Sequence, residues 1–267
     1  MDKSSLTGII LGILAVTLSM VLKGSSLMIL FNAAAIMIIL VGTLAAVVIA
    51  FPMNELKKLP ALFRILFTDL KIPTVQELIP QFKEWTTIAR REGLLALDNH
   101  VDEIEDPFLK HGMKMVIDGQ PPEFVRETLE RELDSMEYRH AAGAQIFSQA
   151  GTYAPTLGVL GAVMGLIAAL GHINDIDTLG PAISAAFVAT LLGIFTGYVL
   201  WHPFANKLRR KSQQEIFVKQ LMIEGILSIQ EGVSARMIED KLLTYVPTNE
   251  RQLLDEAEMG EGENING

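Results

Sequence analysis

The stretch GTYAPTLGVLGAVMGLIAALGHINDIDTLGPAISAAFVATLLGIFTGYVLWHPFANK, residues 151–207, decides the fold of this chain. It contains two uncharged apolar runs, Thr152–Gly171 and Thr178–Trp201, joined by a short turn that carries Asp175 and Asp177. A helix needs about 20 residues to cross a bilayer, so each run is long enough to do so. The stretch therefore predicts two neighbouring transmembrane helices.

Both runs are rich in small residues at helical spacing. The glycines are Gly158, Gly161 and Gly165 in the first run and Gly193 and Gly197 in the second. Small side chains allow helix backbones to approach closely in lipid, where no hydrophobic effect draws helices together. We expect these five glycines to be helix-packing residues.

Two further apolar runs, Leu6–Leu22 and Leu27–Met53, open the chain. The first has no convincing cleavage site and a second run follows at once, so we interpret it as a retained helix rather than a signal peptide. The short link between the runs predicts a tight hairpin. The sequence is that of an all-α polytopic membrane protein with four transmembrane helices, the last two extending into the cytoplasm, and a cytoplasmic helical domain.

The expected domain organisation follows these runs. It comprises a transmembrane hairpin over residues 1–53, a cytoplasmic helical domain over 54–145, a second transmembrane hairpin over 146–206, and C-terminal cytoplasmic helices with an acidic tail over 207–267.

Several helices are expected outside these runs. Glu55–Leu70 mixes cations with large apolar residues, which suits a helix at the membrane surface or, alternatively, an ordinary helix of a soluble domain. Apolar periodicity predicts a helix over Gln81–Asp98, and Asp98–His111 is expected to form a second short helix.

Pro121 and Pro122 suit the start of a third helix, which we expect to enter the membrane without interruption. After Trp201 a helix is expected to reach about Gln230, followed by a short helix over about residues 234–245. The acidic tail from Asp255 is predicted to be disordered.

Composition excludes several classes of function. The chain has no cysteine, its net charge is −9, and half of its residues are hydrophobic. These values argue against disulfides and against a basic nucleic-acid-binding face. The five histidines lack metal-ligand spacing and no catalytic motif is present, so we expect no metal, no cofactor and no enzyme activity.

The juxtamembrane cations predict the orientation. Lys57, Lys58 and Arg64 follow the second run, and the Lys207–Lys211 cluster follows the fourth, whereas the turn at residues 171–180 has none. The positive-inside rule then places both termini and residues 54–145 in the cytoplasm of a cell that carries this protein in its cytoplasmic membrane.

None of the four apolar runs contains Asp, Glu, Lys or Arg. Proton and sodium pathways through lipid normally use a carboxylate, so the chain either does not conduct or borrows an acid from a partner helix. Thr190 is the best polar candidate within the membrane. Its hydroxyl either faces that partner or bonds back to the carbonyl one turn earlier.

Two prolines and one charged stretch complete the candidate sites. Pro155 and Pro203 each remove a helix hydrogen bond, and they either form hinges or mark helix ends near the interface. Arg90, Arg91 and Asp98 lie around Gly93, and residues 91 and 98 share a face if the helix survives the glycine. The alternative for this stretch is a solvated helix surface.

The fourth run, AFVATLLGIF at residues 186–195 followed by Pro203, resembles the signature of the flagellar motor stator A-subunits, the MotA family. The third run and the cytoplasmic stretch ARREGLLALD also resemble that family, and the whole chain is most similar to its Bacillus type.

The resemblance implies a pentamer of this chain around two MotB-like B-subunits, whose aspartate carries the ion, and a cytoplasmic contact with the rotor protein FliG. By position it implies an ion-facing role for Thr190, hinge and torque roles for Pro155 and Pro203, and rotor-contact roles for Arg90 and Asp98, with Arg91 beside them. Sodium-driven relatives tend to carry threonine where this chain has Ala162, which implies proton coupling.

Three alternatives stay open at this point. An ExbB- or TolQ-like energiser of another envelope system is one, although those relatives have three helices. A sodium-driven stator and a passive membrane scaffold are the others.

Overall fold

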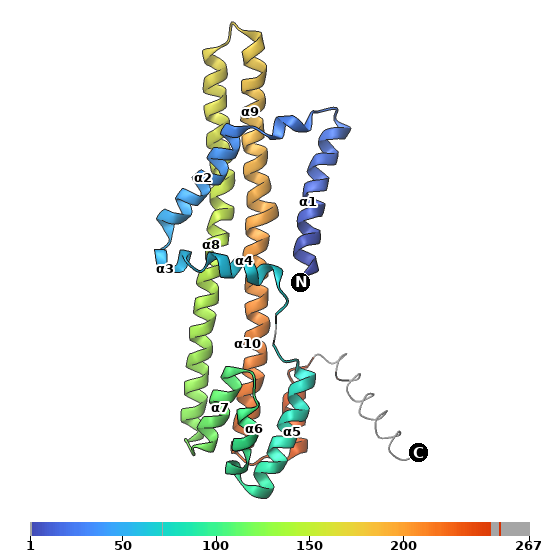
Figure 1. Ribbon diagram of the computed structural model, residues 1–267, viewed down its shortest axis with the longest axis vertical. Coiled ribbons are helices and arrows are strands. Elements are labelled where there is room, and N and C mark those ends of the chain that lie inside the picture. Colours follow the sequence, from blue (N-terminus) through green and yellow to red (C-terminus); the bar gives the residue numbers. More distant parts are fainter. Residues whose placement is uncertain (1, 71, 247–250, 252–267) are drawn as a thin grey trace, which may run out of the picture. The chain divides into compact units, whose positions relative to one another are not determined.

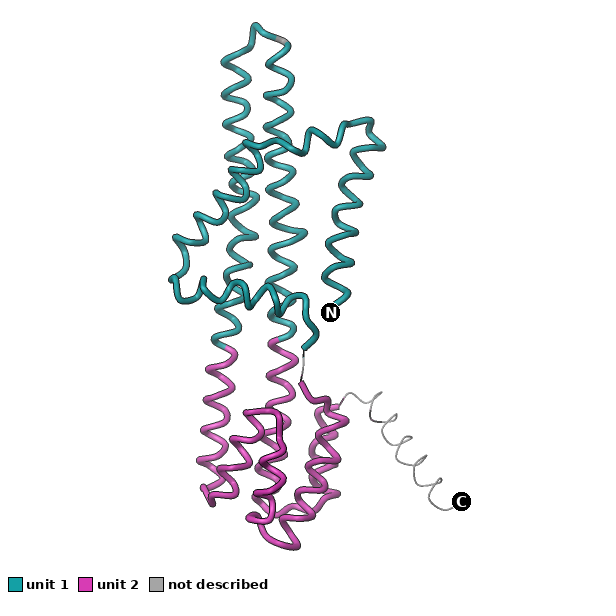
Figure 2. The backbone as a smooth tube through the Cα atoms, in the orientation of Figure 1, with its two compact units in different colours: residues 1–70, 138–211 teal, residues 71–137, 212–267 magenta. Residues whose placement is uncertain are grey.

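The computed structural model describes residues 2–70, 72–246 and 251, and within these residues it contains helices and no strand. Four helices are long and apolar enough to cross a membrane, as the sequence predicts. Figure 2 shows two compact units, residues 1–70 with 138–211 and residues 71–137 with 212–267.

The first unit begins with α1 (Lys3–Leu22), a 3₁₀ turn (Leu27–Leu30) and α2 (Ala33–Ala50). The prediction of a tight hairpin between the two helices is wrong, because α1 and α2 lie on opposite sides of α9 (Ile176–Phe195) in Figure 1. The 3₁₀ turn carries the chain across α9, and α2 then packs against that helix. Ala35 of α2 is buried there in one cluster with Val188 and Ala189 of α9.

After α2 the chain forms two short helices, α3 (Met53–Leu56) and α4 (Leu59–Phe67). The amphipathic face of α4 buries Leu66 completely and places Phe63 edge-on to Phe147, with ring centroids 5.1 Å apart. This helix is the one expected within residues 55–70. Its location at the membrane surface stays a prediction.

The two longest helical stretches are uninterrupted, as expected. Helix α8 (Pro122–Gly171) has 50 residues and is therefore about 75 Å long, against a hydrocarbon core of about 30 Å. Helix α9 continues through a π-helical segment (Thr196–Trp201) into α10 (His202–Gln230). Both stretches are much longer than a bilayer requires.

The second unit contains α5 (Val75–Glu92), a 3₁₀ turn (Leu94–Leu97), α6 (Asp98–Asp102), α7 (Pro107–Ile117), the first part of α8, the end of α10, and α11 (Ala235–Leu243). Its core is apolar and contains Phe82, Trp85 and Leu129, each almost completely buried. The third and last predicted helices outside the membrane are confirmed as α8 and α11.

Two helix predictions in this unit are wrong. The helix expected over Gln81–Asp98 ends at Glu92, because Gly93 adopts a φ of 90° that a helix cannot continue through. The helix expected over Asp98–His111 is divided in two. Asp106 adopts an extended conformation, and its carboxylate accepts hydrogen bonds from the N–H groups of Phe108 and Leu109 to start α7.

Helices α8 and α9 touch at the level of the backbone in the first unit. A β-carbon added to Gly193 would lie 2.7 Å from the carbonyl oxygen of Ala154 and 2.9 Å from the Cα of Gly158. One added to Gly165 would lie 2.9 Å from the Cβ of Ala186. We call this contact surface, formed by the five small-residue positions Gly158, Gly161, Gly165, Gly193 and Gly197 and their neighbours, the glycine seam.

Gly193→Ala is expected to destabilise the protein by about 1–3 kcal/mol, because the added methyl group meets backbone atoms that cannot move aside. Thermal unfolding in detergent, followed by intrinsic tryptophan fluorescence, measures the loss. Gly180→Ala is the matched control, since a β-carbon at Gly180 in the same helix meets nothing within 4 Å. Equal melting temperatures for the two variants would contradict a backbone contact at the seam.

Candidate functional site

The four membrane-spanning segments contain no Asp, Glu, Lys or Arg within their apolar runs, and Thr190 is half-buried beside the glycine seam. A β-carbon added to Gly158 would lie 3.3 Å from the Cα of Thr190. The Thr190 hydroxyl donates to the carbonyl of Ala186 over 3.4 Å, at the long end of the range for such a bond. The structure therefore has the back-bonded arrangement, with a long distance between donor and acceptor.

Ala162 lies one helical turn after Gly158 in α8 and is half-buried. Its methyl group offers no oxygen to a cation. Small residues also form a cavity of about 300 Å³ between α2, α8 and α9, and Gly161 and Ala189 lie in its wall. Ala162 is not among the residues that line this cavity.

The two prolines and the π-helical segment form a single arrangement. Pro155 lies inside α8, so it does not mark a helix end. Pro203 is the second residue of α10 and lies two positions after the end of the π segment Thr196–Trp201. A proline in a helix cannot donate to the carbonyl four residues earlier and collides with it. The wider π turn relieves that collision and lets the helix continue past Pro203.

Pro155 packs directly against the π segment. A β-carbon added to Gly197 would lie 2.7 Å from the Cγ of Pro155 and 2.8 Å from the carbonyl oxygen of Gly151. The ring of His202 lies over Gly151 in the same way, with its nearest atoms 2.8 Å from an added β-carbon. The sequence did not predict the π segment; a proline after a glycine-containing apolar run was its only local signal.

An ion cluster ties the start of the chain to α10 just beyond Pro203. The Asp2 carboxylate lies 2.7 Å from Nζ of Lys207 and 3.2 Å from Nζ of Lys211. Lys211 is buried and also donates to the carbonyl of Ile65, while the Asp2 N–H donates to the carbonyl of Phe67. The hydrogen bond from Lys207 is the main reason why the pKa of Asp2 lies well below its usual value.

This cluster joins α1, α4 and α10, and sequence reasoning missed it. In the sequence, Lys207 and Lys211 indicate only the orientation of the chain in the membrane. Their ion pairs with Asp2 join residues about two hundred positions apart, so no local pattern predicts them. Only the tertiary fold brings Asp2 to them.

The charged stretch around Gly93 is exposed in the second unit. Arg90 and Arg91 end α5, and Asp98 begins α6, with Leu95 projecting between them at 76% exposure. The helix does not survive Gly93, so residues 91 and 98 do not share a helix face. Within the described part of the chain, the structure gives these three charged groups no ion pair.

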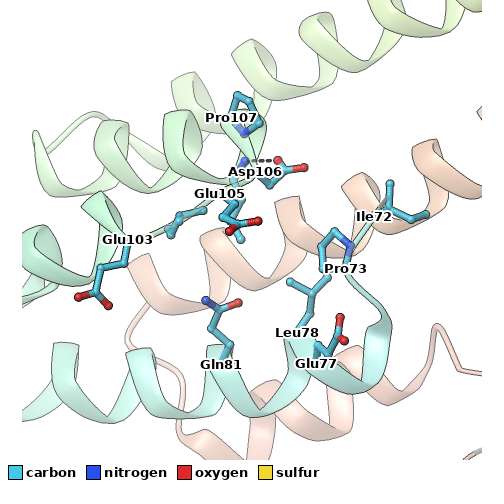
Figure 3. Close-up of a pocket in the computed structure, with 11 residues that line it drawn as sticks. Ile72, Pro73, Glu77, Leu78, Gln81, Glu103, Glu105, Asp106 and Pro107 are labelled. Atoms are coloured by element: carbon cyan, nitrogen blue, oxygen red, sulfur yellow. Dashed lines mark hydrogen bonds between the residues drawn. The ribbon is translucent and has the colours of Figure 1, made fainter. Parts of the chain in front are cut away.

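A cavity of about 590 Å³ lies between α5 and the loop before α7 in the second unit (Figure 3). Glu77, Glu103, Glu105 and Asp106 line it. Two of these carboxylates already have structural partners, since Glu77 caps α5 and Asp106 caps α7. Among the described residues, no group of three or more acidic or imidazole side chains is close enough to hold a metal ion.

The fold and the site define a class of protein: a polytopic α-helical membrane subunit whose spanning helices pack through glycines and whose apolar runs contain no Asp, Glu, Lys or Arg. Residues 100–220 match the MotA/TolQ/ExbB proton channel family, and the chain belongs to this family.

The relatives match over nearly the whole chain. Motility protein A of Bacillus subtilis strain 168 is 61% identical over 264 residues, which covers 99% of this chain and 97% of the relative. The B. subtilis flagellar MotAB stator complex contains a chain that matches with a TM-score of 0.91 at 60% identity, covering 95% of this chain and 99% of the other. A chain of C. jejuni MotAB gives a TM-score of 0.88 at 29% identity, with 93% and 97% covered.

Proposed function

We propose that this chain is the A-subunit of a flagellar motor stator, which couples ion flow through the membrane to torque on the rotor. The observation that carries the proposal is the similarity to motility protein A over 99% of the chain. The matched region includes the first two spans. ExbB- and TolQ-like proteins have three membrane helices, whereas this chain has four candidate spans in its described residues. The resemblance of residues 186–203 to the signature of the motor proteins favours the motor over a passive scaffold.

The missing carboxylate supports a partner subunit. Because the apolar runs offer no acid, a second polypeptide must place one beside the glycine seam near Thr190. The solved relatives are MotAB complexes, so we propose a MotB-like B-subunit as the source of an ion-carrying aspartate. A pentamer of this chain around a B-subunit dimer is the assembly that the family resemblance implies.

Topology supports a cytoplasmic location for the second unit. Four crossings return the chain to the side on which it began, so the segment after α2 and the segment after Trp201 face the same side as Asp2. Lys57, Lys58 and the cluster from Lys207 mark that side as the cytoplasm by the positive-inside rule. We therefore propose a cytoplasmic-membrane protein with both termini inside the cell.

Proton coupling is the expected ion choice, since Ala162 presents a methyl group where a dehydrated sodium ion would need an oxygen ligand. Cells that depend on this chain and its B-subunit for motility should swim at unchanged speed when sodium is replaced by potassium, and should stop within minutes of adding a protonophore. Tethered-cell rotation measures both responses. Rotation that requires sodium and ignores the protonophore would refute proton coupling.

The hinge proposal rests on Pro203, the π segment that precedes it and the contact of Pro155 with Gly197. Pro203→Ala restores an N–H that can bond one turn back, so the helix is expected to lose its π turn and rotation is expected to fall at least about tenfold. B-subunit binding should persist, as measured by co-purification. Pro181→Ala, in the exposed part of α9, is the matched control and should rotate normally. Loss of B-subunit binding in Pro203→Ala would make the proline a structural residue only.

The rotor-contact proposal rests on Arg90, Arg91 and Asp98, which are exposed and form no ion pair with the described residues. Arg90→Glu combined with Arg91→Gln is expected to abolish most torque while leaving the membrane level unchanged, and an opposite charge reversal on the FliG-like rotor protein should restore part of it. Arg131→Glu, on an exposed face of α8, is the control. Normal swarming by the double variant would remove these residues from the rotor contact.

A further inference from the structure

An apolar cleft of about 220 Å³ opens in the first unit between α2, α4 and α8. Leu44 and Val47 of α2, Phe63 of α4, Ala150 of α8 and Trp201 of the π segment line it. Leu44 is 57% exposed, so the cleft is accessible from the side of α2. Almost all of its wall is hydrocarbon, and it lies in the unit that contains the spanning helices.

The wall of this cleft offers almost no polar surface. The hydroxyl of Thr43 is buried and has no hydrogen-bond partner, and it is closed off from the cleft. The indole N–H of Trp201 bonds to no other residue in the described part of the chain.

The indole N–H of Trp201 is a hydrogen-bond donor, so an apolar ligand that carries acceptor oxygens complements this wall. Phospholipid ester carbonyls are acceptors attached to acyl chains, and they lie at the membrane level where tryptophan side chains concentrate.

The segment next to the cleft is basic. Lys57 and Lys58 directly precede Leu59, which also lines the cleft, and both lysines are exposed, as is Arg64 on α4. The structure gives these three cations no ion pair with any described residue, and no side chain caps the N-terminus of α4. Over residues 55–64 Glu55 is the one acidic residue, so the three cations give this stretch a net charge of +2.

We propose that this cleft binds an anionic phospholipid from the bilayer. One acyl chain fills the space between α2 and α4, an ester carbonyl accepts a hydrogen bond from the indole N–H of Trp201, and the phosphate and acidic headgroup lie near Lys57 and Lys58. A zwitterionic lipid fits the cleft equally well but gains less from the cations, because its ammonium group meets the same positive charge. The site therefore selects lipids by headgroup charge.

The site also adjoins the proposed hinge, because Trp201 is the last residue of the π segment. A lipid that contacts Trp201 stabilises the helix conformation in which the indole ring faces the cleft. Lipid composition would then affect the rate of rotation. This consequence rests on the proposed function, whereas the binding site itself does not.

Trp201 provides the measurement, since it is one of only two tryptophans in the chain. The complex of the full chain carrying Trp85→Phe with its B-subunit is reconstituted with lipids whose acyl chains are brominated and quench tryptophan fluorescence on contact. Brominated phosphatidylglycerol is expected to quench Trp201 at a mole fraction at least about fivefold lower than brominated phosphatidylcholine, since each nearby lysine contributes roughly that factor. If Trp85→Phe does not fold, the wild-type chain with Trp201→Phe as reference gives the same difference.

A double variant and a control test the proposal. Lys57→Gln with Lys58→Gln should bring the ratio between the two lipids close to one, whereas Lys23→Gln, at the far end of α1, should leave it unchanged. A ratio near one in the parent, or a ratio that the double lysine variant does not lower, would overturn the anionic-lipid site. Absence of quenching by both lipids would overturn it too, and would show that a neighbouring subunit covers the cleft.

Discussion

The close contact of α8 and α9 at the glycine seam is the constraint on which the first unit depends. Where Gly158 meets Gly193, the two backbones lie too close together for a side chain to fit between them. In lipid such contact must be stabilised by packing rather than by the hydrophobic effect, and packing is strongest where backbones approach. The seam therefore determines how α8 and α9 align, and the alignment brings Pro155 onto Gly197 and Thr190 next to Gly158.

Close to this contact, the π segment interrupts the regular α-helical hydrogen-bond pattern between α9 and α10. A helix that must pass Pro203 cannot keep regular hydrogen bonds, and the extra residue of a π turn resolves the conflict within the membrane. Gly197 lies inside the π segment and against Pro155, so the two helices are in direct contact at this point. The ion cluster of Asp2, Lys207 and Lys211 then holds α10 to α1 and α4 just beyond this point.

Charged side chains are distributed differently in the apolar runs and in two exposed segments outside them. The apolar runs contain no Asp, Glu, Lys or Arg, and in our proposal the acid of the ion pathway comes from a partner subunit. Unpaired cations gather on the segment around Lys57 and Lys58 and at the end of α5 near Arg90. The first set meets the anionic membrane surface in our proposal and the second meets a rotor. The acidic tail predicted from Asp255 lies outside the described residues.

The sequence by itself determined the four spans, the continuous third and fourth helices and the identity of the small-residue face, because hydrophobic length and helical spacing are local properties. It also predicted helix starts at prolines such as Pro122. It did not predict that Gly93 ends α5, since a glycine within a periodic pattern can be tolerated in a helix, and it wrongly paired α1 with α2. Only the tertiary structure decided that pairing, the π segment and the cluster at Asp2. Each depends on contacts between residues far apart in the chain, and no local pattern records which of several available surfaces packs most closely.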